Sequence, residues 1–284
     1  QSLSHISYAV FCLKKKNAMT ETRTSETPEA RPPALRPGWW VPIASLALFG
    51  LAWAGAAELA GDPALFPTPL AVAERMAAEA ATGALWVHLG ATLARVAAAF
   101  AIAMAVGAAI GLAMGMRKGV DAWGDPWLVL FLNLPALVTI VLCYLWIGLT
   151  EAAAIAAVAI NKIPLVATQL REGARALDPA LADMGRVYRL GWAERMRHVV
   201  LPQLAPHFAA AGRSGLALIW KIVLVVEFLG RGSGIGFQIQ LQFQLFDVTG
   251  VLAWALAFMA VMLLVEVLVL QPWERRANRW RGRG

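Results

Sequence analysis

Six apolar runs, each long enough to cross a lipid bilayer, constrain this sequence more than any other feature. A helix needs about 20 mainly apolar residues to span the hydrocarbon core. Charged residues make up 15% of the 284 residues and hydrophobic residues 59%, a balance too apolar for an ordinary soluble domain. We therefore predict an all-α membrane protein with six transmembrane helices, at about residues 41–59, 88–116, 127–149, 152–170, 208–229 and 251–270.

Polar segments divide the rest of the chain. Residues 1–38 are basic at first and then rich in Thr, Glu, Pro and Arg, a composition typical of disorder. Met19 begins a sequence that resembles a natural hydrophilic N-terminus, so we interpret residues 1–18 as upstream translated sequence or a cloning remnant. The transmembrane domain covers residues 39–272, with an amphipathic interfacial helix expected at 70–85, and residues 273–284 form a basic tail.

Basic residues are distributed very unequally between the two sides of the predicted membrane. Alternate segments hold six (1–38), two (117–118), six (171–206) and five (273–284) of the 25 Lys and Arg residues, whereas the intervening segments hold Arg75 and Arg231 alone. Cytoplasmic loops carry such an excess. The bias predicts that both termini lie in the cytoplasm, together with a polar loop at 183–202 between the fourth and fifth spans.

The sequence argues against several classes of function. No GxxxxGK[ST] motif occurs, so the chain cannot bind nucleotide through a P-loop. The net charge of +7 comes from residues that flank the spans, not from a stripe with stacking aromatics, which argues against nucleic acid. Two cysteines and four scattered histidines offer neither a zinc spacing nor a catalytic triad. We expect no catalytic residue, no metal site and no cofactor bound by this chain.

The 183–202 loop looks more structured than a plain solvated loop. Four arginines and two carboxylates share it with an apolar edge formed by Val187, Leu190 and Trp192. Pro202 interrupts the helical pattern at its end. One or two short amphipathic helices offered to a partner fit this pattern better than a solvated positive-inside loop, which is the alternative.

The same loop carries a resemblance to a known family. That family's pattern is Glu-Ala-Ala, a Gly six residues after the Glu, and then Ile-x-Leu-Pro. Here Asp183 stands at the glutamate, Val199 at the isoleucine, and Leu201-Pro202 at the end. Arg189 occupies the glycine position, where glycine would permit a positive φ that arginine adopts only at a cost. In topology and in this loop, the chain resembles the membrane subunit of a type I ATP-binding-cassette (ABC) importer.

Further stretches across residues 65–281 narrow the resemblance. They include FPTPLAV after the first span, ARALDPAL before the loop and HVVLPQLAP at its end. These stretches are similar to permeases of the subfamily that imports nitrate, sulfonates, taurine or bicarbonate. The resemblance implies a bacterial inner-membrane protein that moves such a small anion.

The resemblance also implies partners. These are a second, identical permease copy in the lipid membrane, a separate ATPase dimer that would bind ATP and Mg²⁺, and a periplasmic substrate-binding protein. The ATPase would grip the loop as a coupling helix. The residues expected to contribute to this coupling are Asp183, Arg186, Arg189, Leu190, Gly191, Trp192, Arg195, Leu201 and Pro202.

Polar residues within the predicted spans mark a candidate translocation path. An ammonium group in mid-membrane is expensive and usually faces an interior path or a carboxylate. Lys162 and Lys221 are expected to attract an anion, the alternative for Lys221 being a pair with Glu227 or Glu266. For Glu227 the alternative is a hydrogen bond with the following glycine turn, and for Asn133 it is ordinary helix packing. The candidate path residues are Lys221, Lys162, Asn133, Asn161 and Glu227.

Two features of the second span concern its surroundings. Gly107, Gly111 and Gly115 share one helical face and permit close approach of another helix. Arg95, near the start of this span, is expected to extend its side chain to the membrane interface.

Two other interpretations of function stay open. Within the same family, the substrate could be aromatic, pyrimidine or flavin-like. In a different class, the chain could be a secondary carrier or channel that needs no ATPase, although the 183–202 loop favours the importer.

Overall fold

The computed structural model describes residues 40–272, which form helices joined by short connections. The predictions for residues 1–38 and for the tail 273–284 lie outside the described residues. The helices are α2 Trp40–Ala60, α3 Pro69–Ala81, α4 Ala84–Met116, α5 Lys118–Leu132, α6 Ala136–Ile147, α7 Glu151–Arg175, α8 Pro179–Val187, α9 Trp192–Arg195, α10 Leu201–Gly230, α11 Ile235–Gln244 and α12 Val248–Val265. Two π-helical segments, η1 Met196–Val200 and η2 Glu266–Leu270, adjoin α10 and α12.

Within the described residues, five helices are long and apolar enough to cross a membrane. They are most of α2, all of α4 and α7, and the continuous helices 193–230 and 248–270 that contain α10 and α12. Helices α5 and α6 would add a sixth crossing if the two together form one span. The expected interfacial helix at 70–85 corresponds to α3, which is capped by Thr68.

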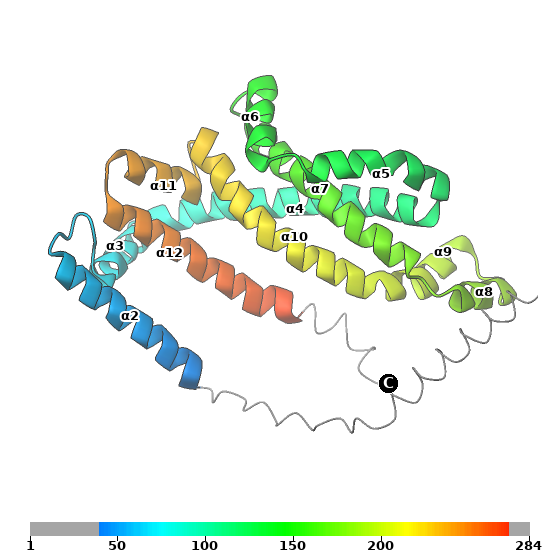
Figure 1. The fold of residues 1–284 in the computed structure, drawn as a ribbon, viewed down its shortest axis with the longest axis horizontal. Helices are drawn as coiled ribbons and strands as arrows, with labels where there is room; N and C mark the ends of the chain where they lie inside the picture. The colour runs from blue at the N-terminus through cyan, green and yellow to red at the C-terminus, as the bar shows by residue number, and fades with distance from the viewer. Residues whose placement is uncertain (1–39, 273–284) are drawn as a thin grey trace, which may run out of the picture. The chain divides into compact units, whose positions relative to one another are not determined.

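Helices α4 and α7 pack together along much of their length (Figure 1). Three glycines of α4 make this possible, because each faces α7 where no side chain would fit. A Cβ atom added at Gly107 would lie 2.7 Å from Cβ of Val166, and one at Gly111 would collide with the carbonyl of Ala167. Gly115 meets α7 in the same way. The absence of a side chain at these three positions therefore lets the two helix backbones approach closely.

Helix α10 packs against α7 and α4 and completes the core (Figure 1). Ile219 and Val223 of α10 are fully buried, and Trp220 packs edge-on against Phe258 of α12 with ring centroids 5.7 Å apart. Helices α11 and α3 both pack against α12. The core is thus built from the apolar faces of α4, α7, α10 and α12.

The segment predicted as one third span differs from the structure. Residues 118–132 form α5, although the beginning of that segment was expected to be a connecting loop. The chain then breaks at Asn133–Pro135 and restarts as α6, with the two helix axes 94° apart. Pro135 explains the break, because it has no N–H to donate and disfavours the helical conformation for Leu134.

The helix around Pro202 also differs from the prediction, which ended the helical pattern there. Helix continues from Ala193 to Gly230 without interruption. The π-turn η1 absorbs the proline: the Leu201 amide donates to the Met196 carbonyl, five residues back. Such a turn commonly accommodates a disturbance in a helix.

Candidate functional site

The α8–α9 segment, residues 179–195, covers the first part of the polar loop predicted at 183–202, and the end of that predicted loop lies in η1 and α10. Asp178 caps α8 by accepting a hydrogen bond from the Ala180 amide at 2.8 Å. At the other end of α8, the Arg189 amide donates to the Arg186 carbonyl and the Leu190 amide to the Gly185 carbonyl, both at 3.0 Å. These two bonds form a Schellman motif, which stops a helix with one residue in the left-handed region.

That left-handed residue is Arg189, with φ of 51°. It is the position at which the family pattern has glycine. Most non-glycine residues adopt this conformation at a cost of roughly 1–2 kcal/mol. The turn between α8 and α9 therefore has the geometry that glycine would give, and the arginine accepts the strain.

Most side chains of the α8–α9 segment are exposed. Val187 is 79% exposed and Tyr188 is similarly open. Arg186 forms a surface ion pair with Asp183 at 2.8 Å. Of the other expected coupling residues, Arg189, Gly191, Leu201 and Pro202 are exposed and Leu190 and Arg195 are half-buried; the side chain of Trp192 is not described.

The next turn is held by the backbone of Gly191. Its amide donates to the Glu194 side chain at 3.1 Å, and its carbonyl accepts from the Arg195 amide at 2.9 Å. This is half of a capping box, and it begins α9. The segment is thus a folded, exposed helical hairpin.

Helices α7 and α10 meet along a polar edge that we call the α7–α10 seam. The Gln169 amide donates to the Ser214 hydroxyl at 2.9 Å, and the His207 ring packs against Gly173. Lys162 of α7 is 9% exposed, whereas Lys221 of α10 is exposed. Neither lysine has a hydrogen bond or ion pair with another residue of the described chain.

The expected carboxylate partners of Lys221 are engaged elsewhere. Glu266 pairs with Arg213 at 3.0 Å, and Glu227 belongs to the cluster described below. The other two candidate path residues differ in exposure. Asn161 is half-buried, whereas Asn133 is exposed and donates to the Val129 carbonyl at 2.7 Å.

A buried charge cluster lies where α4, α7 and α10 meet the turn before α11. It consists of Arg95, Glu151, Glu227 and Arg231. The Arg95 side chain is 5% exposed, and its guanidinium contacts Glu227 at 2.6 Å and both oxygens of Glu151 at 2.7 and 2.8 Å. Its remaining N–H groups bond the hydroxyl and carbonyl of Ser233 at 2.6 and 2.7 Å.

Glu227 is the fully buried member of this cluster. Its Oε2 accepts from the Thr92 hydroxyl and from the Gly236 amide, both at 2.9 Å. Thr92 in turn accepts from the Ile235 amide at 2.9 Å. Every oxygen of the carboxylate therefore has a donor, as a buried charge requires. The alternative named for Glu227, a hydrogen bond with the glycine turn, is present in the structure.

The turn itself depends on Gly234. This residue has φ of 108°, and an added Cβ would collide with the Glu227 carboxylate. Its amide donates to Nδ1 of His88 at 3.0 Å. The GRGSGIG stretch thus wraps a buried carboxylate and leads into α11.

Arg231 and Glu151 form the exposed side of the buried charge cluster. Arg231 pairs with Glu151 and donates to the Leu149 carbonyl at 2.6 Å. The expectation that Arg95 extends to the interface is wrong, because Arg95 is 4% exposed and engaged by carboxylates of α7 and α10. One signal in the sequence could have indicated this cluster. Residues 95 and 151 lie near the starts of their predicted spans and residue 227 near the end of its span, which places all three near the same side of the membrane.

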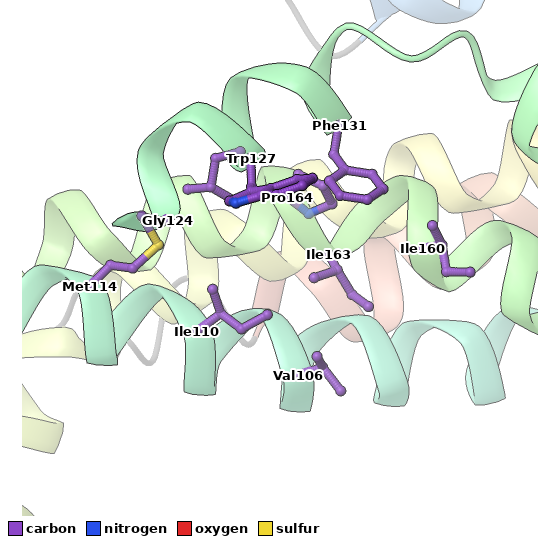
Figure 2. Close-up of a pocket in the computed structure, with 10 residues that line it drawn as sticks. Val106, Ile110, Met114, Gly124, Trp127, Phe131, Ile160, Ile163 and Pro164 are labelled. Atoms are coloured by element: carbon purple, nitrogen blue, oxygen red, sulfur yellow. The ribbon is translucent and has the colours of Figure 1, made fainter. Parts of the chain in front are cut away.

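An apolar cavity of about 320 Å³ lies between α4, α5 and α7. Figure 2 shows Val106 and Ile110 of α4 facing Ile163 of α7, with Trp127 and Phe131 of α5 on the opposite wall. Pockets for small ligands have volumes of roughly 300–1,000 Å³ and mostly apolar walls.

The described residues contain no group of three or more His, Cys, Asp or Glu side chains placed to hold a metal ion.

A family model matches residues 101–271, which is more than half of the chain. Its description is "Binding-protein-dependent transport system inner membrane component".

Curated relatives agree with this match. The chain is 30% identical over 246 residues to the putative aliphatic sulfonates transport permease protein SsuC of Escherichia coli, covering 85% of this chain and 90% of that one. It is 27% identical over 217 residues to SsuC of Bacillus subtilis, covering 76% and 78%. It is also 32% identical over 247 residues to the riboflavin transport system permease protein RibX of Chloroflexus aurantiacus, covering 86% and 91%.

Two solved structures share the fold. One is an amino acid ABC transporter with histidines, at a TM-score of 0.57 and 24% identity, covering 70% of this chain and 97% of that one. The other is the inward-facing MetNI methionine ABC transporter, at a TM-score of 0.53 and 16% identity, covering 69% and 97%.

Proposed function

We propose a function for this chain within the family to which it belongs, the inner membrane components of binding-protein-dependent transport systems. It is a permease subunit of an ABC importer, moves a small anion, and is driven by a separate ATPase that docks on the α8–α9 segment. The cytoplasm would lie on the side of that segment. The secondary carrier and the channel are disfavoured by the family assignment.

The exposed α8–α9 hairpin is the observation that carries the proposal. The segment keeps a Schellman turn at a strained arginine, together with caps at Asp178 and Gly191. Such strained and capped turns are typical of functional surfaces and are not expected in a loop that contacts only solvent. The exposed Val187 and Tyr188 side chains provide apolar surface for a partner. Their place at the end of α8 suits contact with a chain outside the helical bundle.

Co-purification tests this docking. We would co-express the chain with the products of its genomic neighbours, ask whether an ATPase co-purifies, and compare wild type with Val187→Glu/Tyr188→Glu. The matched control is Leu65→Glu, which changes an apolar side chain of similar exposure, 72%, in the loop before α3. We expect the ATPase to remain with wild type and control and to be lost from the double variant. Equal retention by all three would place the docking surface elsewhere.

The proposal of an anionic substrate rests on the two lysines of the α7–α10 seam and on the similarity to sulfonate permeases. The remaining path candidates, Asn133, Asn161 and Glu227, stay in the proposal, but we do not expect all three to contact the substrate. Since Glu227 is fully enclosed by its partners, we assign it to holding the glycine turn that borders the path.

A flavin-like substrate is the second candidate. The similarity to RibX favours it, and so does the cavity lined by Trp127 and Phe131, whose rings suit a flat aromatic ligand. Uptake of riboflavin and of ethanesulfonate by vesicles that contain the complete transporter would separate the two candidates. If the vesicles take up riboflavin but not ethanesulfonate, the proposal of an anionic substrate is wrong.

A further inference from the structure

We propose that Lys162 and Lys221 together form one anion subsite in the α7–α10 seam, which binds the oxyanion group of an alkanesulfonate-like substrate. This inference deepens the proposed function and rests on it, because it names the two ammonium groups that hold the transported anion.

Lys162 is the first observation. The side chain is nine-tenths buried, at the middle of α7, and has no hydrogen bond or ion pair with another described residue. A buried ammonium group without a counter-charge is costly, so such groups in spans usually serve a path or a ligand. The carboxylate at the start of α7 and those of the neighbouring spans are engaged with arginines: Glu151 and Glu227 with Arg95, and Glu266 with Arg213.

The register of α7 and α10 is the second observation. Gly173 lies against His207, Gln169 bonds Ser214, and Val166 contacts Gly215. The two helices are therefore antiparallel, and each step up α7 is a step down α10. One turn beyond Val166 and Gly215, this register brings Lys162 level with residues 218–221 of α10. Both lysines thus lie at the same depth.

The two lysines also lie on the same edge of the seam. Residues 162, 166, 169 and 173 share the face of α7 that meets α10, because they are three, four or seven apart. Lys221 follows Ser214 by two turns on α10 and thus continues the edge on which Gln169 and Ser214 meet. An anion at this edge would contact the tip of a buried ammonium and the tip of an exposed one.

The surroundings suit an oxyanion. Leu218 and Val225, which flank Lys221 on the exposed face of α10, are apolar and provide no competing carboxylate. Each ammonium has three donors, and a sulfonate has three acceptor oxygens. Charge-assisted hydrogen bonds are stronger than those between neutral groups. A neutral flavin ring would leave both charges unpaired.

The first test uses the purified chain without any partner. Ethanesulfonate is the probe, and ethanesulfonamide, which has nearly the same shape without the charge, is the control. A ligand that binds only the folded state raises the thermal unfolding midpoint. We expect ethanesulfonate to raise that of wild type, with a much smaller shift in Lys162→Met and Lys221→Met. Lys162→Arg and the matched control Lys118→Met should respond as wild type does. No sulfonate-specific shift in wild type, or an equal shift in both Met variants, would overturn the subsite.

The fold of each variant is checked by its midpoint without ligand. Met is unbranched and apolar, so Lys162→Met removes an unpaired buried charge and should not lower the midpoint. This separates loss of binding from loss of folding.

Uptake by vesicles containing the ATPase complex gives the second test. We expect each Met variant to raise the KM for ethanesulfonate by at least about tenfold. If both lysines hold one anion, the effect of the double variant should differ from the product of the single effects. ATP-driven sulfonate uptake with an unchanged KM in all variants would reject the subsite and leave the proposed function standing. Failure of the ATPase to bind wild type would reject the proposed function, while the unfolding measurement would still decide the subsite.

Discussion

The buried charge cluster and the α8–α9 segment use the same residue types in opposite ways. Both contain arginines and carboxylates, and they lie toward opposite ends of α7 (Figure 1). In the cluster, Arg95 and Glu227 are enclosed, and every nitrogen of the Arg95 guanidinium and both carboxylate oxygens of Glu227 have partners within the fold, whereas the buried Nε of Arg231 has none among the described residues. In the α8–α9 segment, the side chains of Asp183 and Arg186 are mostly exposed, and among the described residues they pair with each other.

The difference shows that solvent access, not composition, decides what a charged residue does here. A buried pair is strongly coupled because the medium screens it poorly, and breaking one partner leaves an uncompensated charge. An exposed pair is worth little in energy, so its side chains are free to contact another protein. Four substitutions test this contrast between buried and exposed charges, and their expected effects on stability decrease in the order below.

Arg95→Met should have the largest effect. It leaves the buried Glu227 carboxylate without its cation, which typically lowers the free energy of unfolding by about 3–5 kcal/mol. The measurement is reversible unfolding in mixed micelles. The control is Arg95→Met/Glu227→Met, which should recover more than half of the loss, because neither charge is left alone. If the free energy of unfolding of Arg95→Met lies within about 0.5 kcal/mol of wild type, the cluster does not stabilise the fold as its burial indicates.

Thr92→Val should come second. It removes a hydroxyl that donates to Glu227 and accepts from the Ile235 amide. Because both partners are buried, we expect a loss of about 1–3 kcal/mol in the free energy of unfolding. Thr92→Ser keeps the hydroxyl and should lose much less. If Ser and Val variants unfold alike, the methyl group rather than the hydroxyl is what matters.

Arg189→Gly should act in the opposite direction. Glycine adopts the positive φ without strain, so the free energy of unfolding of the α8–α9 segment should rise by up to about 1 kcal/mol. The segment's local stability is measured by amide hydrogen exchange. Arg186→Gly is the control: it lies inside α8 with ordinary helical geometry, so it should lower the same quantity by about 0.5–1 kcal/mol. Slower exchange in both variants would exclude the strain argument.

Asp183→Asn should have the smallest effect. It breaks the exposed pair with Arg186, and we expect a change of less than about 0.5 kcal/mol in the free energy of unfolding, reduced further by 0.5 M salt. Glu227→Gln, measured in parallel, should cost several times more and respond less to salt. Equal costs for the two would remove the contrast between the regions.

Much of the helical architecture could be predicted from the sequence because it depends on local composition. Long apolar runs give α2, α4, α7, α10 and α12 nearly at their predicted places. The glycine spacing on α4 likewise indicated a face suited to close packing, and the structure puts α7 against it. Periodicity and length are properties of one segment, so no knowledge of its neighbours was needed.

The features that escaped prediction depend on more than one segment. Arg95 lies 132 residues from Glu227 in the sequence, and only the packing of α4 on α10 brings them together. The sharp bend between α5 and α6 was also missed, although Pro135 was visible, because proline predicts a break but not its angle. At Pro202, the π-turn that lets the helix continue has no clear sequence signal.

The continuity of the helix through Pro202 has a mechanical consequence. Residues 193–230 form one unbroken helix of 38 residues. Its α10 part has 30 residues and is therefore about 45 Å long. A tilt of α10 by roughly 10° about its midpoint would move its two ends in opposite directions by about 4 Å each. Because no loop interrupts the helix, a displacement of α9 would reach the glycine turn around Glu227 through α10, and the reverse.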